Sequence, residues 1–257
     1  MKVPGLLIIL LLLCFPATAQ KTVSVGGNIV WAGVDRAGDM FVVLDNGGVE
    51  KFDKTGKKIG AHKFKAPPTL VDPLDGVQSF YYNRQTRQYG NMSYDFTSVS
   101  QFTIDPAFAI SPWLVCPALR ELWILDSADF SIRKTAQSST FISLERVLQH
   151  LPDKRITDFI HLREYQNYVF VLDKSSGVHM INPLGRFVRT LGEKGMTYFN
   201  FLGEELYYLS GNELVLVDLY TQETRRMPLP VEGKFALITD EVFYIASGSK
   251  VVISSIR

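Results

Sequence analysis

The side chains that most often perform catalysis or hold metal ions are few and scattered in this sequence. The four histidines among its 257 residues show no short spacing of the kind that paired zinc ligands have; they are His62, His150, His161 and His179. The sequence also has no EF-hand-like series of acids, no glycine-rich phosphate loop and no G-x-S-x-G serine. We therefore predict no catalytic residue, no metal ligand and no bound cofactor.

Three aspartates stand at equivalent places and could suggest acid–base chemistry. Asp45, Asp126 and Asp173 each follow a run of four apolar residues. A residue placed identically in several units usually belongs to the repeat itself, where its carboxylate accepts hydrogen bonds from a turn. We interpret these aspartates as structural turn residues.

The N-terminal segment determines both the expected location and the cysteine chemistry. Residues 1–19 combine Lys2, an unbroken apolar run over 6–15 and a small-residue motif ending at Ala19, which is the pattern of a cleaved signal peptide. The run is too short to span a bilayer. Cleavage after Ala19 removes Cys14, so Cys116 has no disulfide partner and is expected to be a small buried apolar residue. We expect the protein in the periplasm or outside the cell, where it could lie peripherally at the outer membrane.

Composition excludes some classes of partner. The chain has 27 Lys+Arg and 26 Asp+Glu residues, a formal net charge of +1. Nucleic-acid-binding proteins and polybasic membrane-surface proteins carry a basic excess, so we predict neither function. At 46% hydrophobic residues the chain can bury a sizeable core. We expect residues 20–257 to form one domain with no membrane span.

A repeated unit organises the rest of the chain. In each unit an apolar run ends in a polar or small residue, a turn follows and a second apolar run begins; the first runs end at residues 45, 83, 126, 173, 210 and 246. The mean period of about 40 residues is the length of a four-stranded propeller blade. Asn-Gly-Gly, Ser-Gly and Gly-Asn between the runs supply the positive φ angles of tight hairpins. The sequence thus predicts an all-β fold, a six-bladed β-propeller.

The two ends of the chain indicate how the ring closes. The sixth unit stops at Arg257, one strand short of a blade, whereas residues 22–25 offer a spare strand before the first unit. We predict that this N-terminal strand completes the last blade, because closure removes open sheet edges.

Two segments are candidate contact surfaces for a partner. Residues 143–151 carry apolar side chains at helical spacing and end before Pro152, which predicts an amphipathic helix inserted between the third and fourth blades. The second unit mixes tyrosine with arginine, two residue types enriched at interfaces. Ordinary packing is the alternative for both segments. The candidate partner-contact residues are Tyr81, Tyr82, Arg84, Arg87, Tyr89, Arg146 and His150.

The first unit carries a likeness to a known repeat. Residues 35–45, DRAGDMFVVLD, and 49–57, VEKFDKTGK, resemble bacterial six-bladed β-propellers of the NHL and lactonase-like type. A narrower resemblance, in length and in the A-x-A-Q cleavage site, is to exported periplasmic propellers of the Bacteroidota. These include accessory and plug subunits of the type IX secretion translocon. No motif matches such a subunit residue by residue, so the resemblance transfers no functional residues.

Two functions of different classes remain open. The leading one is a non-enzymatic protein-binding or scaffolding propeller with a protein partner, which the resemblance places in an outer-membrane secretion complex. The alternative is a metal-dependent propeller hydrolase or lactonase. Lactonase-like propellers hold a divalent metal in the central channel with Glu, Asn and Asp, and no unique acidic cluster in this sequence matches theirs.

Overall fold

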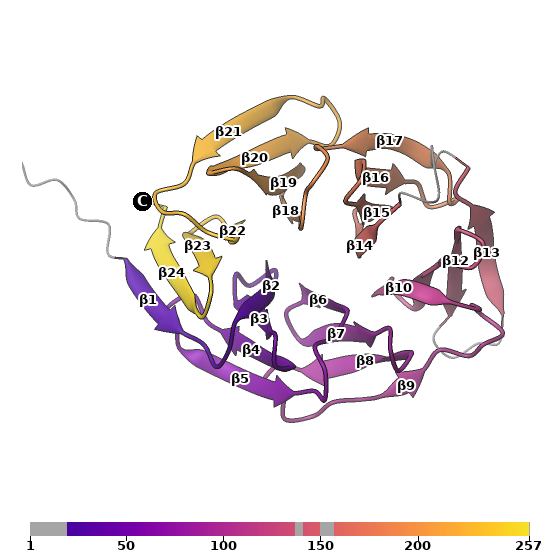
Figure 1. The fold of residues 1–257 in the computed structure, drawn as a ribbon, viewed down its shortest axis with the longest axis horizontal. Helices are drawn as coiled ribbons and strands as arrows, with labels where there is room; N and C mark the ends of the chain where they lie inside the picture. The colour runs from indigo at the N-terminus through magenta and orange to yellow at the C-terminus, as the bar shows by residue number, and fades with distance from the viewer. Residues whose placement is uncertain (1–19, 137–140, 150–156, 257) are drawn as a thin grey trace, which may run out of the picture.

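Six antiparallel sheets of four strands each make up the protein and stand around a common axis (Figure 1). The computed structural model describes residues 20–136, 141–149 and 157–256. In five sheets the four strands are consecutive in the chain, and the first of them is innermost. The protein is therefore a six-bladed β-propeller, as the repeat predicted.

The blades are numbered here in chain order. Blade 1 contains β2 (Ile29–Val34), β3 (Met40–Leu44), β4 (Gly48–Phe52) and β5 (Lys58–Lys63). Blade 2 contains β6 (Leu70–Asp75), β7 (Gln78–Asn83), β8 (Gln88–Ser93) and β9 (Phe102–Thr103). Blade 3 contains β10 (Pro112–Pro117), β11 (Glu121–Asp126), β12 (Ser131–Ala136) and β13 (Ile142–Val147).

The second half of the ring repeats this order. Blade 4 contains β14 (Phe159–Tyr165), β15 (Tyr168–Asp173), β16 (Gly177–Ile181) and β17 (Phe187–Leu191). Blade 5 contains β18 (Asn200–Leu202), β19 (Glu205–Ser210), β20 (Glu213–Asp218) and β21 (Thr224–Pro228). Blade 6 contains β22 (Phe235–Ile238), β23 (Val242–Ser247), β24 (Lys250–Ser255) and β1 (Lys21–Ser24).

The N-terminal strand closes the ring, which confirms the prediction made from the two chain ends. β1 pairs antiparallel with β24, with Val23 opposite Val251, and forms the outer strand of blade 6 (Figure 1). Val23 is buried, so the pairing also adds apolar contact. Because the last blade contains strands from both ends of the chain, the ring cannot open without breaking these hydrogen bonds.

The core lies within and between the blades. β3, β4 and β16 are buried along their whole length, although β4 includes Glu50 and Lys51 and β16 includes His179. One buried apolar cluster joins blades 2, 3 and 4 and includes the fully buried Cys116. Burial raises the pKa of the Cys116 thiol well above its usual value, so Cys116 is a packing residue.

The helix expected over residues 143–151 does not form, and that prediction is wrong. Residues 142–147 are instead the outer strand β13, in register with β12 from Ser131 opposite Val147 to Thr135 opposite Ile142. The pairing of β12 with a fourth strand overrides the helical spacing of the apolar residues, because tertiary contacts readily outweigh local propensity. Residues 150–156 lie outside the described residues. No segment of the described chain forms an apolar helix long enough to cross a bilayer.

Candidate functional site

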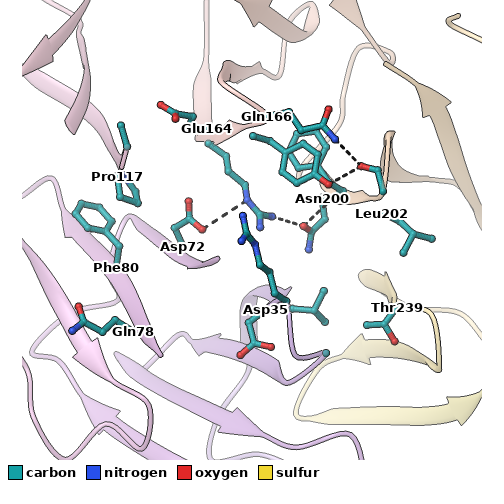
Figure 2. Close-up of a pocket in the computed structure, with 18 of the residues that line it drawn as sticks. Asp35, Asp72, Gln78, Phe80, Pro117, Glu164, Gln166, Asn200, Leu202 and Thr239 are labelled. Carbon is teal, nitrogen blue, oxygen red and sulfur yellow. Dashed lines mark hydrogen bonds and ion pairs between the residues drawn. The ribbon is translucent and has the colours of Figure 1, made fainter. Parts of the chain in front are cut away.

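A cup at the centre of the ring is the candidate site (Figure 2). Its volume is about 950 Å³, and residues of all six blades line it. It opens on the face made by the turns that join the first and second strands of each blade, which we call the mouth face. The turns that join the second and third strands make the opposite face. The blades differ in the turns between their first and second strands, so the residues that line the cup differ from one blade to the next.

Arg163 of β14 is the central polar group of the cup. Its Nη1 donates a hydrogen bond to Oδ1 of Asn200 on β18, and its Nε lies 3.8 Å from Oδ1 of Asp72 on β6 (Figure 2). The guanidinium also lies 5.6 Å from the ring centroid of Phe201. Arg163 is 5% exposed, and its Nε makes no hydrogen bond within the described residues. A buried guanidinium therefore retains hydrogen-bonding capacity beside a cavity.

An aromatic wall stands next to Arg163. The rings of Tyr165 and Phe201 are stacked, with centroids 4.0 Å apart and an interplanar angle of 3°. The Tyr165 hydroxyl donates to the carbonyl of Gly203 at 2.6 Å, which fixes the ring, and Nε2 of Gln166 donates to the same carbonyl at 3.5 Å (Figure 2). Blades 4 and 5 thus contribute a fixed pair of stacked rings and the Gln166 amide to the lining of the cup.

Two acids that reach the cup already have partners inside the protein. Oδ2 of Asp35 lies 3.1 Å from the buried ammonium of Lys51, which also lies 3.4 Å from Asp39. Burial and the neighbouring Asp35 raise the pKa of Asp39 above its usual value. Glu164 accepts a hydrogen bond from the indole N–H of Trp123. The lining of the cup is polar and includes four acids, Asp35, Asp72, Glu164 and Asp240, and two arginines, Arg36 and Arg163.

Aromatic rings fill the axis beneath the cup. Trp31 of β2 and His161 of β14 come from blades 1 and 4 on opposite sides of the ring, and their ring centroids are 5.9 Å apart. His161 also makes an edge contact with Phe199 at 5.2 Å. Burial, followed by the charge of Arg163, lowers the pKa of His161 to about 3, so the imidazole is neutral. His161 is a packing residue that limits the depth of the cup.

A Ser–His–Asp cluster in blade 4 resembles a catalytic triad in composition only. Oγ of Ser176 lies 2.8 Å from Nε2 of His179, but the Ser176 hydroxyl donates to Oδ2 of Asp173 at 2.6 Å. In a catalytic triad the serine donates to histidine, and the acid binds the other ring nitrogen. Here Nδ1 of His179 faces Thr190 at 3.3 Å. The cluster is built to hold the turn after β15, not to activate a nucleophile.

The recurrent aspartates act as turn residues, as their spacing predicted. Asp45 accepts a hydrogen bond from the backbone N–H of Asn28 at 3.1 Å, and Asp173 accepts one from the N–H of Asp158 at 2.9 Å. Asp126 accepts one from the N–H of Ile110 at 2.7 Å. In every case the carboxylate ties the turn on the opposite face to the segment that enters the same blade. Among the described residues, no three His, Cys, Asp or Glu side chains gather as metal ligands would.

The candidate partner-contact residues separate into buried and exposed groups. Tyr81, Tyr82 and Tyr89 are buried, and the hydroxyls of Tyr81 and Tyr82 donate to backbone carbonyls at 2.9 and 2.6 Å. Ordinary packing, the alternative left open for this unit, describes these three tyrosines, and because the adjacent Tyr81 and Tyr82 are both buried, β7 buries both of its faces and not one. Arg146 is exposed on β13, and His150 lies outside the described residues.

Two of the predicted residues meet on the opposite face. The guanidinium of Arg84 lies 3.8 Å from the ring centroid of Trp113, and Nη2 of Arg87 donates to the carbonyl of Ile110 at 2.8 Å. We call Arg84, Arg87, Ile110 and Trp113 the arginine–tryptophan cluster. Sequence analysis found its arginines but missed Ile110 and Trp113, which approach from the segment entering blade 3.

The sequence analysis also missed the residues of the cup. Arg163 carries only a weak sequence signal, because residues 159–165, FIHLREY, also include His161 and Glu164. Asn200, Gln78 and Gln166 carry no such signal, since each is an ordinary polar residue at a strand end or turn. They become a group only when the ring closes.

Comparison with known proteins defines the fold and nothing narrower. The chain matches no protein-family profile and no curated protein sequence. A streptogramin B lyase structure has a TM-score of 0.60 at 12% identity, with 91% of this chain and 96% of that one covered. The Neurospora crassa Pan2 WD40 domain has a TM-score of 0.59 at 7% identity, with 89% of each chain covered. The Myceliophteria thermophila Cps50 (Swd1) β-propeller domain gives 0.58 at 9% identity, with 92% and 99% covered. At these identities the shared property is the fold, and the chain is a six-bladed β-propeller.

Proposed function

We propose that this chain is an exported, non-enzymatic propeller that binds a protein partner through its opposite face. The observation that carries the proposal is the arginine–tryptophan cluster. Arginine and tryptophan are the side chains most enriched among residues that dominate binding energy at protein interfaces. Ile110 adds to the cluster an apolar side chain that is 69% exposed.

The cluster is held in place before any partner arrives. The indole N–H of Trp113 donates to the carbonyl of Phe159 at 2.8 Å, which ties the ring to the start of blade 4. The Arg84 backbone N–H donates to Oγ1 of Thr69 at 2.9 Å, so the turn after β7 is also fixed. Side chains that need no reordering lose little entropy when they bind. The surface is thus suited to recognition, and its two guanidinium groups favour a partner that presents carboxylates.

The proposal extends to the place where the protein works. We place it in the periplasm or outside the cell, as an accessory or plug subunit of an outer-membrane protein secretion complex. Its support is the signal-peptide pattern of residues 1–19 and the resemblance to exported propellers. N-terminal sequencing of the native protein checks export: a mature chain beginning at Gln20 is expected, and an intact Met1 would contradict it.

The main test is purification of the native protein from membranes in mild detergent, followed by mass spectrometry of the proteins that accompany it. We expect a stoichiometric partner, lost from a variant that combines R84E with I110D. The matched control is L184D, because Leu184 is 59% exposed on the turn after β16, away from the cluster. A partner that survives R84E/I110D would contradict the assignment of the surface.

A metal-dependent hydrolase or lactonase is the second candidate, and the feature that favours it is the cup, which has room for a small substrate. The same purification distinguishes it from the first. A lone monomer that carries a divalent ion and cleaves lactones or esters, with the activity abolished by a chelator, would replace the protein-binding function by this one.

A further inference from the structure

We propose that the cup on the mouth face is a binding site for a neutral oligosaccharide. The site is separate from the arginine–tryptophan cluster, which lies on the opposite face. The proposal does not depend on the protein-binding function, and either can fail without the other. It rests on four properties of the lining: its charge balance, its amide groups, its aromatic wall and its size.

The charge balance of the cup disfavours an anionic ligand. Lys51 is shared between Asp35 and Asp39, and Glu164 accepts a hydrogen bond from the uncharged indole of Trp123. The Arg163 guanidinium lies between Asn200 and Asp72 (Figure 2). At the mouth, the exposed Arg36 and Asp240 carry opposite charges. Because the lining has four acids, Asp35, Asp72, Glu164 and Asp240, against these two arginines, an anionic ligand would lose its hydration here without gaining an uncompensated positive charge. An uncharged polar ligand meets no such penalty.

The lining supplies hydrogen-bonding groups of every kind that hydroxyl groups need. Five amide side chains, each both donor and acceptor, belong to it: Gln78, Asn91, Gln166, Asn167 and Asn200. Oδ1 of Asn200 already accepts from Arg163 and from the N–H of Phe201 at 2.9 Å, so its Nδ2 is the group left to donate. Nε of Arg163 adds a buried donor that makes no hydrogen bond within the described part of the chain. A hydroxyl both donates and accepts, so a polyhydroxylated ligand can pair with all of these groups at once.

The aromatic wall favours a sugar over a simple polar solute as the ligand. Tyr165 lies flat against Phe201, and its hydroxyl is held by Gly203, so this aromatic pair is held rigidly in the lining of the cup. A pyranose has an apolar C–H face as well as a polar rim, and an aromatic surface beside amide groups complements both. The cup volume of about 950 Å³ lies near the upper end for small-molecule sites, which fits a short oligosaccharide.

The test measures binding by the native protein to an array of neutral, N-acetylated and acidic oligosaccharides, followed by calorimetric titration of the best neutral binder. G203W should fill the cup, because Gly203 lines it and has open space where a Cβ would be. G211W is the matched control: Gly211 lies in the turn after β19 on the opposite face, has equally open space, and has a φ of +59° against +57° for Gly203. The backbone strain is therefore the same in both variants.

We expect a neutral oligosaccharide to bind, with affinity at least tenfold weaker in G203W and unchanged in G211W. If either tryptophan variant fails to fold, the double variant Q78A/N91A, which removes two amides of the lining, should weaken the same binding about tenfold. Absence of binding to every neutral glycan, binding of acidic glycans only, or binding insensitive to both cup variants would overturn the proposal. A phage-displayed random peptide library is screened in parallel. Peptide capture that G203W abolishes, without glycan binding, would overturn the proposal in favour of a protein loop.

Discussion

The two faces of the ring use polar residues in different ways. On the opposite face an aspartate recurs at the end of the second strand of blades 1, 3 and 4, and its carboxylate accepts hydrogen bonds from a backbone N–H of the segment that enters the same blade. On the mouth face the polar residues of the cup do not recur, and each blade contributes a different set. Arg163, for example, has no counterpart in the innermost strands of the other blades.

This difference separates residues that hold the blades from residues that are available to a ligand. A side chain that the fold needs six times is expected at the same place in several repeats, and its hydrogen bonds are satisfied internally. A side chain that serves one ligand is needed once, and part of its hydrogen-bonding capacity remains. Stability should therefore depend strongly on the recurrent aspartates and weakly on the exposed amides of the cup.

The largest effect is expected at Asp126. Its carboxylate accepts backbone hydrogen bonds from Ile110, Ser111 and Ala128 and pairs with Arg133 at 2.6 Å, and both side chains of that pair are buried. D126A leaves Arg133 without this partner and three N–H groups without an acceptor. We expect a loss of about 3–5 kcal/mol in the free energy of unfolding, measured by urea denaturation.

D126N is the control for Asp126, because it keeps the shape and one acceptor oxygen but removes the charge. The free energy of unfolding of D126N should lie between that of the native protein and that of D126A. A loss below about 1 kcal/mol for D126A would mean that the recurrent aspartates are not structural, and the contrast between the faces would collapse.

The next effect concerns pH and His161, a residue that occurs once and is nevertheless structural. Its pKa in the fold, about 3, lies below the ordinary value of about 6.5, so the unfolded chain takes up the proton first as pH falls. The contribution of the neutral His161 to the free energy of unfolding is complete above pH about 6.5 and is lost progressively towards pH 3. Between pH 7.5 and 4.5 we expect His161 to account for about 3 kcal/mol of the fall in stability.

Thermal or urea unfolding at several pH values checks this expectation. H161F should flatten the pH dependence, because phenylalanine can keep the contacts with Trp31 and Phe199 without titrating. H62Q is the comparison, since His62 on β5 is only partly buried, and it should flatten the curve much less. Equal slopes for H161F and the native protein would show that the histidine is not held neutral.

The fold could be predicted from the sequence because its information is local and repeated. Apolar runs, turn residues and a period of about 40 residues report on each blade separately, and the spare strand at residues 22–25 indicates the closure. The prediction of a helix over residues 143–151 was wrong for the opposite reason. The apolar spacing there is short, and the hydrogen-bond requirement of β12, which decides the outcome, is not visible in that segment.

The cup could not be predicted because it is assembled from distant residues without a shared motif. Val34 and Ile238 end the innermost strands of the first and last blades, and ring closure alone makes them neighbours of one cavity. In the arginine–tryptophan cluster, Arg84 signalled an interface by its type, whereas its contact with Trp113 depends on how blades 2 and 3 pack. The sequence shows the type of each residue directly, whereas the contacts between residues of different blades depend on how the blades pack.

A smaller effect is expected where neighbouring blades touch. A Cβ at Gly60 of β5 would lie 2.2 Å from the backbone oxygen of Asp95 in blade 2, so G60A forces the two blades apart. We expect a loss of about 2 kcal/mol by urea denaturation, as for other overpacked sites. G76A is the control, because a Cβ there meets its nearest atom at 3.9 Å, and its effect should stay below about 0.5 kcal/mol. Equal stabilities of the two variants would show that the contact between blades 1 and 2 can adjust to the added methyl group without a loss of stability.

The smallest effect is expected at Gln78, which lines the cup and is exposed. Its amide serves no carboxylate and no buried turn in the described structure, so Q78A should change the free energy of unfolding by less than about 0.5 kcal/mol. The same substitution removes a donor and an acceptor from the cup, and it should weaken any ligand held there. Urea denaturation and ligand titration on one preparation measure both quantities. Loss of binding with unchanged stability would place Gln78 among the residues that are available to a ligand, in contrast to Asp126, which holds its blade. A loss of stability above about 1.5 kcal/mol would show instead that the residues of the cup, like the recurrent aspartates, hold the blades.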